Sequence, residues 1–208
     1  MGHGLINMTE IKVLVEGKHK KVKGGFLIGS TSTLIKTNKK IVVDPGSFVN
    51  EDKIIKALKK EGLTPKDINI VMLTHLHIDH TTNLHLFKNA KVILKFVGKD
   101  YPGQIHTIKK GLLQRFELED GKEIAKDVEI ILTPGHTLDM VSVVVGTPDG
   151  KVVITGDAIR LPEFADLKNK ELSFITANMK EYNKSRKKIL EIADYIIPGH
   201  GKIFKVDK

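Results

Sequence analysis

A run of potential metal ligands directly after an apolar segment constrains the fold of this chain more than any other feature. The apolar segment INIVMLT is followed without a break by HLHIDH. An apolar run of this length is typical of a strand buried on both faces of its sheet. His75 and His77 point the same way while the backbone stays extended, and Asp79 and His80 follow where the chain turns. Because one ion needs three or four ligands and these two pairs reach different points in space, the fold must bring further ligands to this strand end.

Three later segments that look like strands also end in a ligand-type residue preceded by a glycine. These residues are His136 after VEIILTPG, Asp157 after KVVITG and His200 after DYIIPG. Glycine has no side chain, so the backbone at these points can turn tightly and pass close to a buried ion. If the strands run as this pattern indicates, all three residues lie at the C-terminal ends of their strands, as His75 does. We therefore expect seven ligand-type residues to meet there, which is what a two-metal site requires.

Short apolar segments alternate with turn signals along the rest of the chain. Strands are predicted for IKVLVEG, GFLIGSTSTLIKT, KIVVD, AKVILK, VEIILT, VSVVVGT, KVVITGD and DYIIPGH. Helices are predicted for NEDKIIKALKKEGL, from an Asn50 cap to Gly62, for TANMKEYNKSRKKILEIA, and shortly after HLHIDH. This order predicts mixed sheets with helices on the outside, in a single domain over residues 1–208 whose residues 1–8 are a tag or disordered.

The composition excludes several classes of protein. With no cysteine in the chain, a disulfide framework is excluded and a metal site must use nitrogen and oxygen ligands. No apolar run approaches the roughly 18 residues that span a bilayer, and MGHGLINMTEIK lacks the regions of a signal peptide. We therefore expect a cytoplasmic protein with no membrane partner. The net charge of +9 fits either attraction to RNA or a solvated lysine-rich surface, and the scattered lysines without interleaved aromatics favour the surface.

The seven ligand-type residues resemble the ligand set of the metallo-β-lactamase superfamily of hydrolases, and every position of that set is filled. The resemblance extends from about Gly24 to about Phe204, and it includes Asp44 in IVVDPG, where the family has a supporting aspartate. It implies an α+β fold, the four-layer αββα sandwich. With Asp157 in the bridging position and no cysteine, the set is similar to the glyoxalase II, lactonase and ribonuclease branches. The segment THLHIDHTTNLHLF, the tail ADYIIPGHGKIFKV and the small size also resemble one subgroup of the superfamily.

What this resemblance implies is a dinuclear centre. His75, His77 and His136 would hold the first metal, Asp79, His80 and His200 would hold the second, and Asp157 would bridge them. Two divalent ions, zinc or alternatively iron or manganese, would share a water and lower its pKa from about 15.7 toward 7. Asp79 would orient this nucleophile, and Asp44 would fix ligand tautomers. Arg160, Tyr101 and the segment RLPEFADL are candidates for the pocket lining.

Three functions remain open from the sequence. The first is a hydrolase whose metal-bridging hydroxide attacks an ester, thioester or lactone carbonyl of a small metabolite. The second is a phosphodiesterase or ribonuclease, favoured by the charge of +9, and the third is a mononuclear iron persulfide dioxygenase. Metal storage is disfavoured because an open bridging position is not a closed structural site. Outside the ligand set, we expect His85 to support the site or lie on the surface, His106 to lie in a surface loop, and His19 to be solvated in its lysine run.

Overall fold

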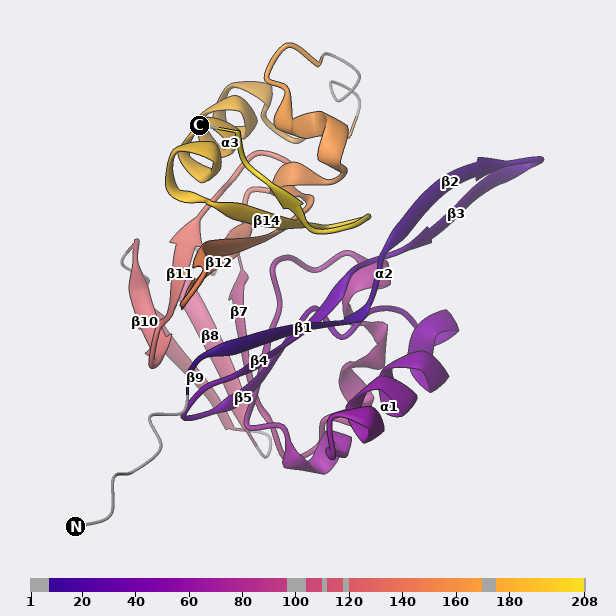
Figure 1. Ribbon diagram of the computed structural model, residues 1–208, viewed down its shortest axis with the longest axis vertical. Coiled ribbons are helices and arrows are strands. Elements are labelled where there is room, and N and C mark those ends of the chain that lie inside the picture. The colour runs from indigo at the N-terminus through magenta and orange to yellow at the C-terminus, as the bar shows by residue number, and fades with distance from the viewer. Residues whose placement is uncertain (1–7, 97–103, 110–111, 118–119, 170–174, 208) are drawn as a thin grey trace.

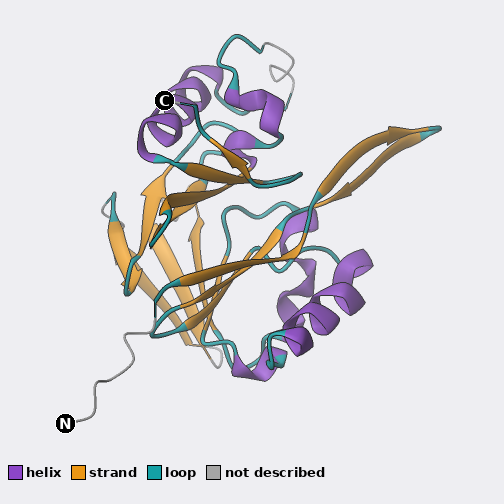
Figure 2. Ribbon diagram, in the orientation of Figure 1, coloured by secondary structure: helices purple, strands orange, loops and turns teal. Residues whose placement is uncertain are grey.

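The computed structural model describes residues 8–96, 104–109, 112–117, 120–169 and 175–207 (Figures 1 and 2). The strands are β1 (Glu10–Val15), β2 (Lys18–Val22), β3 (Gly25–Gly29), β4 (Ser32–Lys36), β5 (Lys40–Val43), β6 (Ile70–Met72), β7 (Lys91–Phe96), β8 (Gln104–Lys109), β9 (Leu112–Glu117), β10 (Lys122–Ala125), β11 (Val128–Leu132), β12 (Val141–Thr147), β13 (Gly150–Gly156), β14 (Tyr195–Pro198) and β15 (Phe204–Lys205). The helices are α1 (Glu51–Lys60), α2 (Ile78–Thr81) and α3 (Met179–Ile192).

These strands form two large mixed sheets and one separate hairpin. Among the described residues, the first sheet has seven strands in the order β1-β4-β5-β6-β7-β8-β9, and the second has six in the order β10-β11-β12-β13-β14-β15. The hairpin pairs β2 with β3. Within the sheets, β5, β6 and β7 run parallel to one another, and so do β13 and β14. Parallel neighbours end at the same edge of a sheet, and these edges carry the ligand-type residues.

Alternating apolar side chains of the central strands build the layers. Val43 of β5 and Val145 of β12 pack together in a cluster between the two sheets. Their chain neighbours face the other way, because successive side chains of a strand point to opposite faces. Val42 packs in the cluster that contains residues of α1, and Val144 packs in the cluster that contains Ile189 of α3. Helix, sheet, sheet and helix therefore follow one another, which confirms the α+β sandwich of four layers (Figure 2).

The N-terminal strands differ from the prediction. GFLIGSTSTLIKT forms two strands, β3 and β4, rather than one, and the lysine run KHKKV forms β2. β4 pairs with β1 inside the first sheet, whereas β2 and β3 pair only with each other among the described strands. They project from the sandwich as an arm, the β2–β3 arm (residues 18–29) (Figure 1). Its apolar residues Phe26, Leu27 and Ile28 stay exposed, so an apolar pattern alone did not show where this strand would pack.

Two helix predictions also need correction. Asn50 is the N-cap residue of α1 as expected, but its side chain accepts no capping hydrogen bond, and it is the last residue of the 3-10 turn Phe48–Asn50. The helix expected after HLHIDH is a single turn, α2, which continues as the 3-10 segment Thr82–Leu86.

His106, expected in a loop, lies on strand β8, and its side chain is outside the described part of the chain. Within the described ranges, no helix is long and apolar enough to cross a membrane.

Candidate metal centre

The seven ligand-type residues come from the strand ends of both sheets and meet at one place. His75 and His77 follow β6, Asp79 and His80 lie in α2, His136 follows β11, Asp157 follows β13 and His200 follows β14. Their ligand atoms form two groups, and within each group all these atoms lie within 4.8 Å of one another. The first group contains His75, His77, His136 and Asp157, and the second contains Asp79, His80 and His200.

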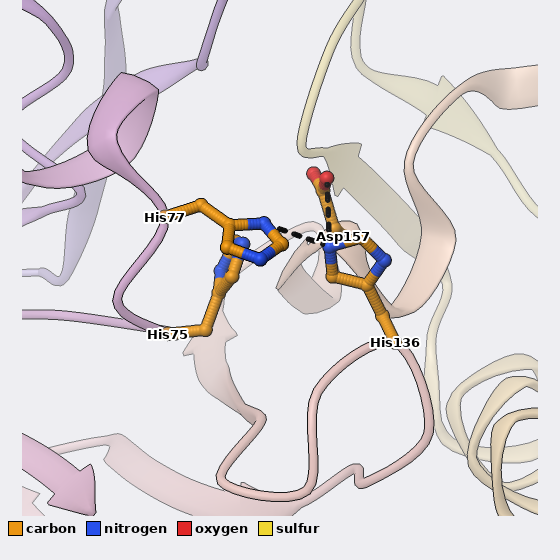
Figure 3. A group of neighbouring side chains, drawn as sticks. All are labelled: His75, His77, His136 and Asp157. Atoms are coloured by element: carbon orange, nitrogen blue, oxygen red, sulfur yellow. Dashed lines mark hydrogen bonds and ion pairs between the residues drawn. The ribbon is translucent and has the colours of Figure 1, made fainter. Parts of the chain in front are cut away.

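The first group brings three imidazoles and one carboxylate together (Figure 3). Nε2 of His136 lies 3.1 Å from Nδ1 of His77 and 3.4 Å from Oδ2 of Asp157. The His75 ring lies 4.5 Å from the His77 ring between centroids. Nδ1 of His75 lies 3.0 Å from Oγ1 of Thr74, and its Nε2 is buried without a hydrogen bond to any described residue. A buried imidazole nitrogen without a partner is unusual in a folded protein and fits a metal ligand.

Acceptors on the outer side orient the imidazoles of the second group. Nδ1 of His80 donates to Oδ2 of Asp44 over 2.8 Å, and Nδ1 of His200 donates to the main-chain oxygen of Gly29 over 2.9 Å. In the neutral form of each imidazole the outer nitrogen carries the proton, so Nε2 keeps a lone pair directed into the group. Nε2 of His80 lies 3.7 Å from Oδ2 of Asp79, and Nε2 of His200 lies 3.5 Å from the same oxygen.

Asp157 lies between the two groups. While its Oδ2 approaches His136, its Oδ1 lies 3.4 Å from Nε2 of His80 and 3.3 Å from Nε2 of His200. The carboxylate of Asp157 can occupy this position only because residue 199 is a glycine, since a Cβ atom on residue 199 would overlap Oδ1 of Asp157. The glycine before His200, which the sequence analysis singled out, is thus required by a close approach of the β13 and β14 ends.

Burial and neighbouring charges shift the pKa values of the centre in opposite directions. Burial lowers the pKa of His136 to about 4, and burial followed by the charge of His80 holds the pKa of His75 well below its usual value. Burial opposes the charge of His80 too, but the carboxylates of Asp44 and Asp157 raise its pKa well above 6.5. Burial would raise the pKa of Asp157, but His80 and His200 lower it well below its usual range. At neutral pH, His75 and His136 are therefore neutral and Asp157 is ionised.

These residues fit divalent metal ions. Imidazole nitrogens and carboxylate oxygens are the donors that zinc, iron and manganese accept in proteins. Both groups contain at least three such donors. The Nε2 atoms of His75 and His80 are buried and have no hydrogen-bond partner in the described part of the chain, as expected for ligands aimed at an ion.

The structure places the other candidate residues as follows. His85 is exposed, with Nε2 3.4 Å from Oε2 of Glu51, which confirms the surface alternative. His19 is half-buried rather than solvated: the β2–β3 arm holds its ring 5.9 Å from the ring of His200. The prediction was wrong because a lysine run does not indicate the hairpin that places His19 beside His200. Arg160 lies three residues after Asp157, and Tyr101 is outside the described residues.

Comparison with known proteins assigns the family. The family model described as the metallo-beta-lactamase superfamily matches residues 25–200. The chain belongs to the metallo-β-lactamase superfamily. Metallo-β-lactamase domain-containing protein 1 of Xenopus laevis is 32% identical over 201 residues, which cover 95% of this chain and 82% of the frog protein. The human protein of the same name is 33% identical over 172 residues, covering 80% of this chain and 59% of the human protein. The motif spacing and the tail indicated this same subgroup of the superfamily.

Other superfamily members carry hydrolase names. A Methanocaldococcus jannaschii protein named a probable metallo-hydrolase is 36% identical over 171 residues, covering 79% of this chain and 73% of that protein. A Thermotoga maritima protein assigned to the metallo-β-lactamases has the same fold, with a TM-score of 0.73 at 22% identity, covering 96% of this chain and all (100%) of that one. These comparisons place the chain among the metal-dependent hydrolases of the superfamily.

We predict that the metal-free protein loses stability as the pH falls from about 6.5 to 4. In this window the unfolded chain protonates His136, whereas the folded chain, with a pKa of about 4, does not. Acid therefore favours unfolding, by about 3 kcal/mol from this residue alone. His75 acts in the same direction, because its folded pKa is also lowered. His80 does not contribute to this loss, because its raised pKa keeps it protonated in the folded protein, and the unfolded chain also protonates it below its ordinary pKa of about 6.5.

Denaturant unfolding of chelator-treated protein at a series of pH values measures this loss. The variant His136→Gln should lower the slope of unfolding free energy against pH in that window. The variant His85→Gln, which removes an exposed histidine, should leave the slope unchanged. Equal slopes for His136→Gln and the unsubstituted protein would contradict the assignment.

Proposed function

We propose that this chain is a dinuclear metal-dependent hydrolase that acts on the ester, thioester or lactone carbonyl of a small metabolite. The observation that carries the proposal is the carboxylate of Asp157, whose two oxygens face different ligand groups. Oδ2 lies 3.4 Å from Nε2 of His136, and Oδ1 lies 3.3 Å from Nε2 of His200. A carboxylate in this position can bridge two ions.

The proposed ligands are the residues of the two groups. The first ion takes His75, His77 and His136, the second takes Asp79, His80 and His200, and Asp157 contacts both. Zinc is the proposed metal, since it accepts this mixture of imidazole and carboxylate donors. Two divalent ions bound there would supply an activated water as the nucleophile and would polarise the substrate carbonyl.

Asp79 is the proposed catalytic residue. Its side chain is 14% exposed, more than the 6% of Asp157, so its carboxylate is the more accessible to a substrate. Oγ of Ser30 donates a hydrogen bond of 2.8 Å to the main-chain oxygen of Asp79 and holds the turn in place. The carboxylate would accept a hydrogen bond from the attacking water, take up its proton and pass that proton to the leaving group.

Similar proteins support a carbonyl substrate. An N-acyl homoserine lactonase of a Bacillus species is 30% identical over 118 residues, which cover 53% of this chain and 46% of the lactonase. A solved N-acyl homoserine lactone hydrolase, described with the product N-hexanoyl-L-homoserine at its catalytic metal centre, has a TM-score of 0.65 at 20% identity, covering 94% of this chain and 93% of that one. The net charge of +9 favours the second candidate, phosphodiester cleavage in RNA.

Metal analysis combined with a panel of lactone, thioester and phosphodiester substrates tests the proposal. We expect close to two zinc ions per chain, hydrolysis of at least one carbonyl substrate, loss of that activity on treatment with a chelator, and recovery when zinc is returned. Cleavage of RNA without carbonyl hydrolysis, together with RNA affinity that falls steeply with salt, would favour the second candidate. One iron per chain with activity lost on replacement by zinc would favour the dioxygenase.

A further inference from the structure

Arg160 is a cation next to the proposed metal centre without an acidic partner in the described structure. It follows the 3-10 turn Asp157–Ile159, which begins at the proposed bridging carboxylate. Its main-chain oxygen accepts a hydrogen bond of 2.7 Å from the main-chain nitrogen of His200. The backbone of Arg160 is therefore tied to residues of both proposed ligand sites.

The side chain of Arg160 is held in place but left unsatisfied. Its Cζ lies 5.2 Å from the ring centroid of Phe164, which is buried and provides a rigid surface for the guanidinium. Nε of Arg160 is buried without a hydrogen-bond partner, and no carboxylate of the described residues forms an ion pair with the guanidinium. A buried Nε–H group without a partner costs free energy, and an anion that accepts a hydrogen bond from it would remove this cost.

Arg160 also lies near the base of the β2–β3 arm. The pKa of His19 is lowered by burial and next by the charge of Arg160. The ring of His19 lies 5.9 Å from the ring of His200, to whose main-chain nitrogen the oxygen of Arg160 is hydrogen-bonded.

We propose that Arg160 binds an anionic group of the substrate, a carboxylate or a phosphate, and so makes this enzyme selective for anionic esters, thioesters or lactones. The proposal rests on the proposed function, because it assigns the substrate of the same centre. The planar guanidinium binds either group through two parallel hydrogen bonds, which a lysine cannot reproduce. The contact with the buried Phe164 ring restricts the guanidinium, so a bound anion would lie close to the proposed metal ligands.

Matched thioesters test this assignment in the zinc-loaded protein. S-succinyl-N-acetylcysteamine carries a free carboxylate, its methyl ester is neutral, and the 3-phosphonopropionyl analogue carries a phosphonate. We expect the unsubstituted protein to prefer an anionic thioester over the neutral one by about tenfold or more in kcat/KM. In Arg160→Met, kcat/KM for the anionic thioester should fall about tenfold more than kcat/KM for the neutral one, mainly through a higher KM. Arg160→Lys should restore little of the carboxylate preference.

A binding measurement decides the role of Arg160 independently of turnover. By calorimetry on the zinc-loaded proteins, succinate should bind Arg160→Met about tenfold more weakly than the unsubstituted protein. The matched control Lys168→Met removes one exposed positive charge from the same segment and should leave succinate affinity unchanged. Metal content and circular dichroism confirm that each variant is folded and loaded.

The outcomes separate the two proposals. The unsubstituted protein could hydrolyse the anionic and the neutral thioester equally well, and Arg160→Met could have the same KM and the same succinate affinity as the unsubstituted protein. In that case the role proposed for Arg160 is wrong, while the hydrolase function stands. If no thioester or lactone is hydrolysed but Arg160→Met still weakens succinate binding, the anion site stands and the proposed reaction fails. A stronger preference for the phosphonate than for the carboxylate would assign a phosphate-bearing substrate.

Discussion

Replacing Asp157 by alanine is expected to reduce the metal content to about one ion per chain and to lower kcat/KM for a carbonyl substrate by at least about 10³-fold. The carboxylate of Asp157 lies between both ligand groups, 3.4 Å from His136 on one side and 3.3 Å from His200 on the other. Its removal takes a ligand from each ion. Each group then keeps three ligands, and no carboxylate is shared between the two ions. Metal analysis and steady-state kinetics on the same preparation measure both effects.

The matched control is Asp149→Ala, which removes an exposed aspartate from the turn before β13. It should retain both ions and full activity. Two ions and full turnover in Asp157→Ala would refute the bridging assignment. An unfolded Asp157→Ala variant would be recognised by circular dichroism, and Asp157→Asn, which keeps the shape but not the charge, then provides the comparison.

Replacing Asp44 by asparagine is expected to destabilise the metal-free protein by about 3 kcal/mol or more and to weaken binding of the second ion by about 10- to 100-fold. The buried Asp44 carboxylate accepts three hydrogen bonds. Oδ1 accepts from the main-chain nitrogen of Thr74 at 2.8 Å, while Oδ2 accepts from Oγ1 of Thr74 at 2.7 Å and from Nδ1 of His80 at 2.8 Å. An amide group offers only one acceptor oxygen and would leave at least one of these donors unpaired.

Asparagine is the appropriate substitution because Asp44 has a φ of 49°, a left-handed conformation that asparagine tolerates better than alanine. Asp127→Asn is the matched control, since Asp127 also has a positive φ, of 61°, but lies exposed and away from the ligand set. Denaturant unfolding and competitive metal titration measure the two effects. Unchanged affinity for the second ion in Asp44→Asn would show that His80 does not depend on this support.

Much of the fold and of the candidate site is predictable because both depend on local patterns. The short apolar segments KIVVD, VSVVVGT and KVVITGD predicted strands, and β5, β12 and β13 confirm them. HLHIDH and the glycine-preceded residues His136, Asp157 and His200 predicted ligands at strand ends, and all of them lie in the two groups. Their binding of metal, and the single domain over residues 1–208, stay predictions.

The features that the sequence did not reveal depend on contacts between distant segments. His19 comes near His200 across 181 positions of the chain because the base of the β2–β3 arm lies beside His200, and nothing in KHKKV indicates that position. Asp44 was expected to support the ligands, but its contacts with Thr74 and His80 follow only from the positions of β5 and β6.

The sequence alone is enough to name the residues that could bind metal and the strand ends at which they lie, since the two-residue period of a strand and the turns at glycine are local properties of the backbone. The three-dimensional structure was needed to show that Asp157 faces both groups, that Gly199 must lack a side chain, and that Arg160 has no acidic partner among the described residues. These facts depend on how the two sheets pack against each other, and that packing is set by long-range burial rather than by any short stretch of the chain.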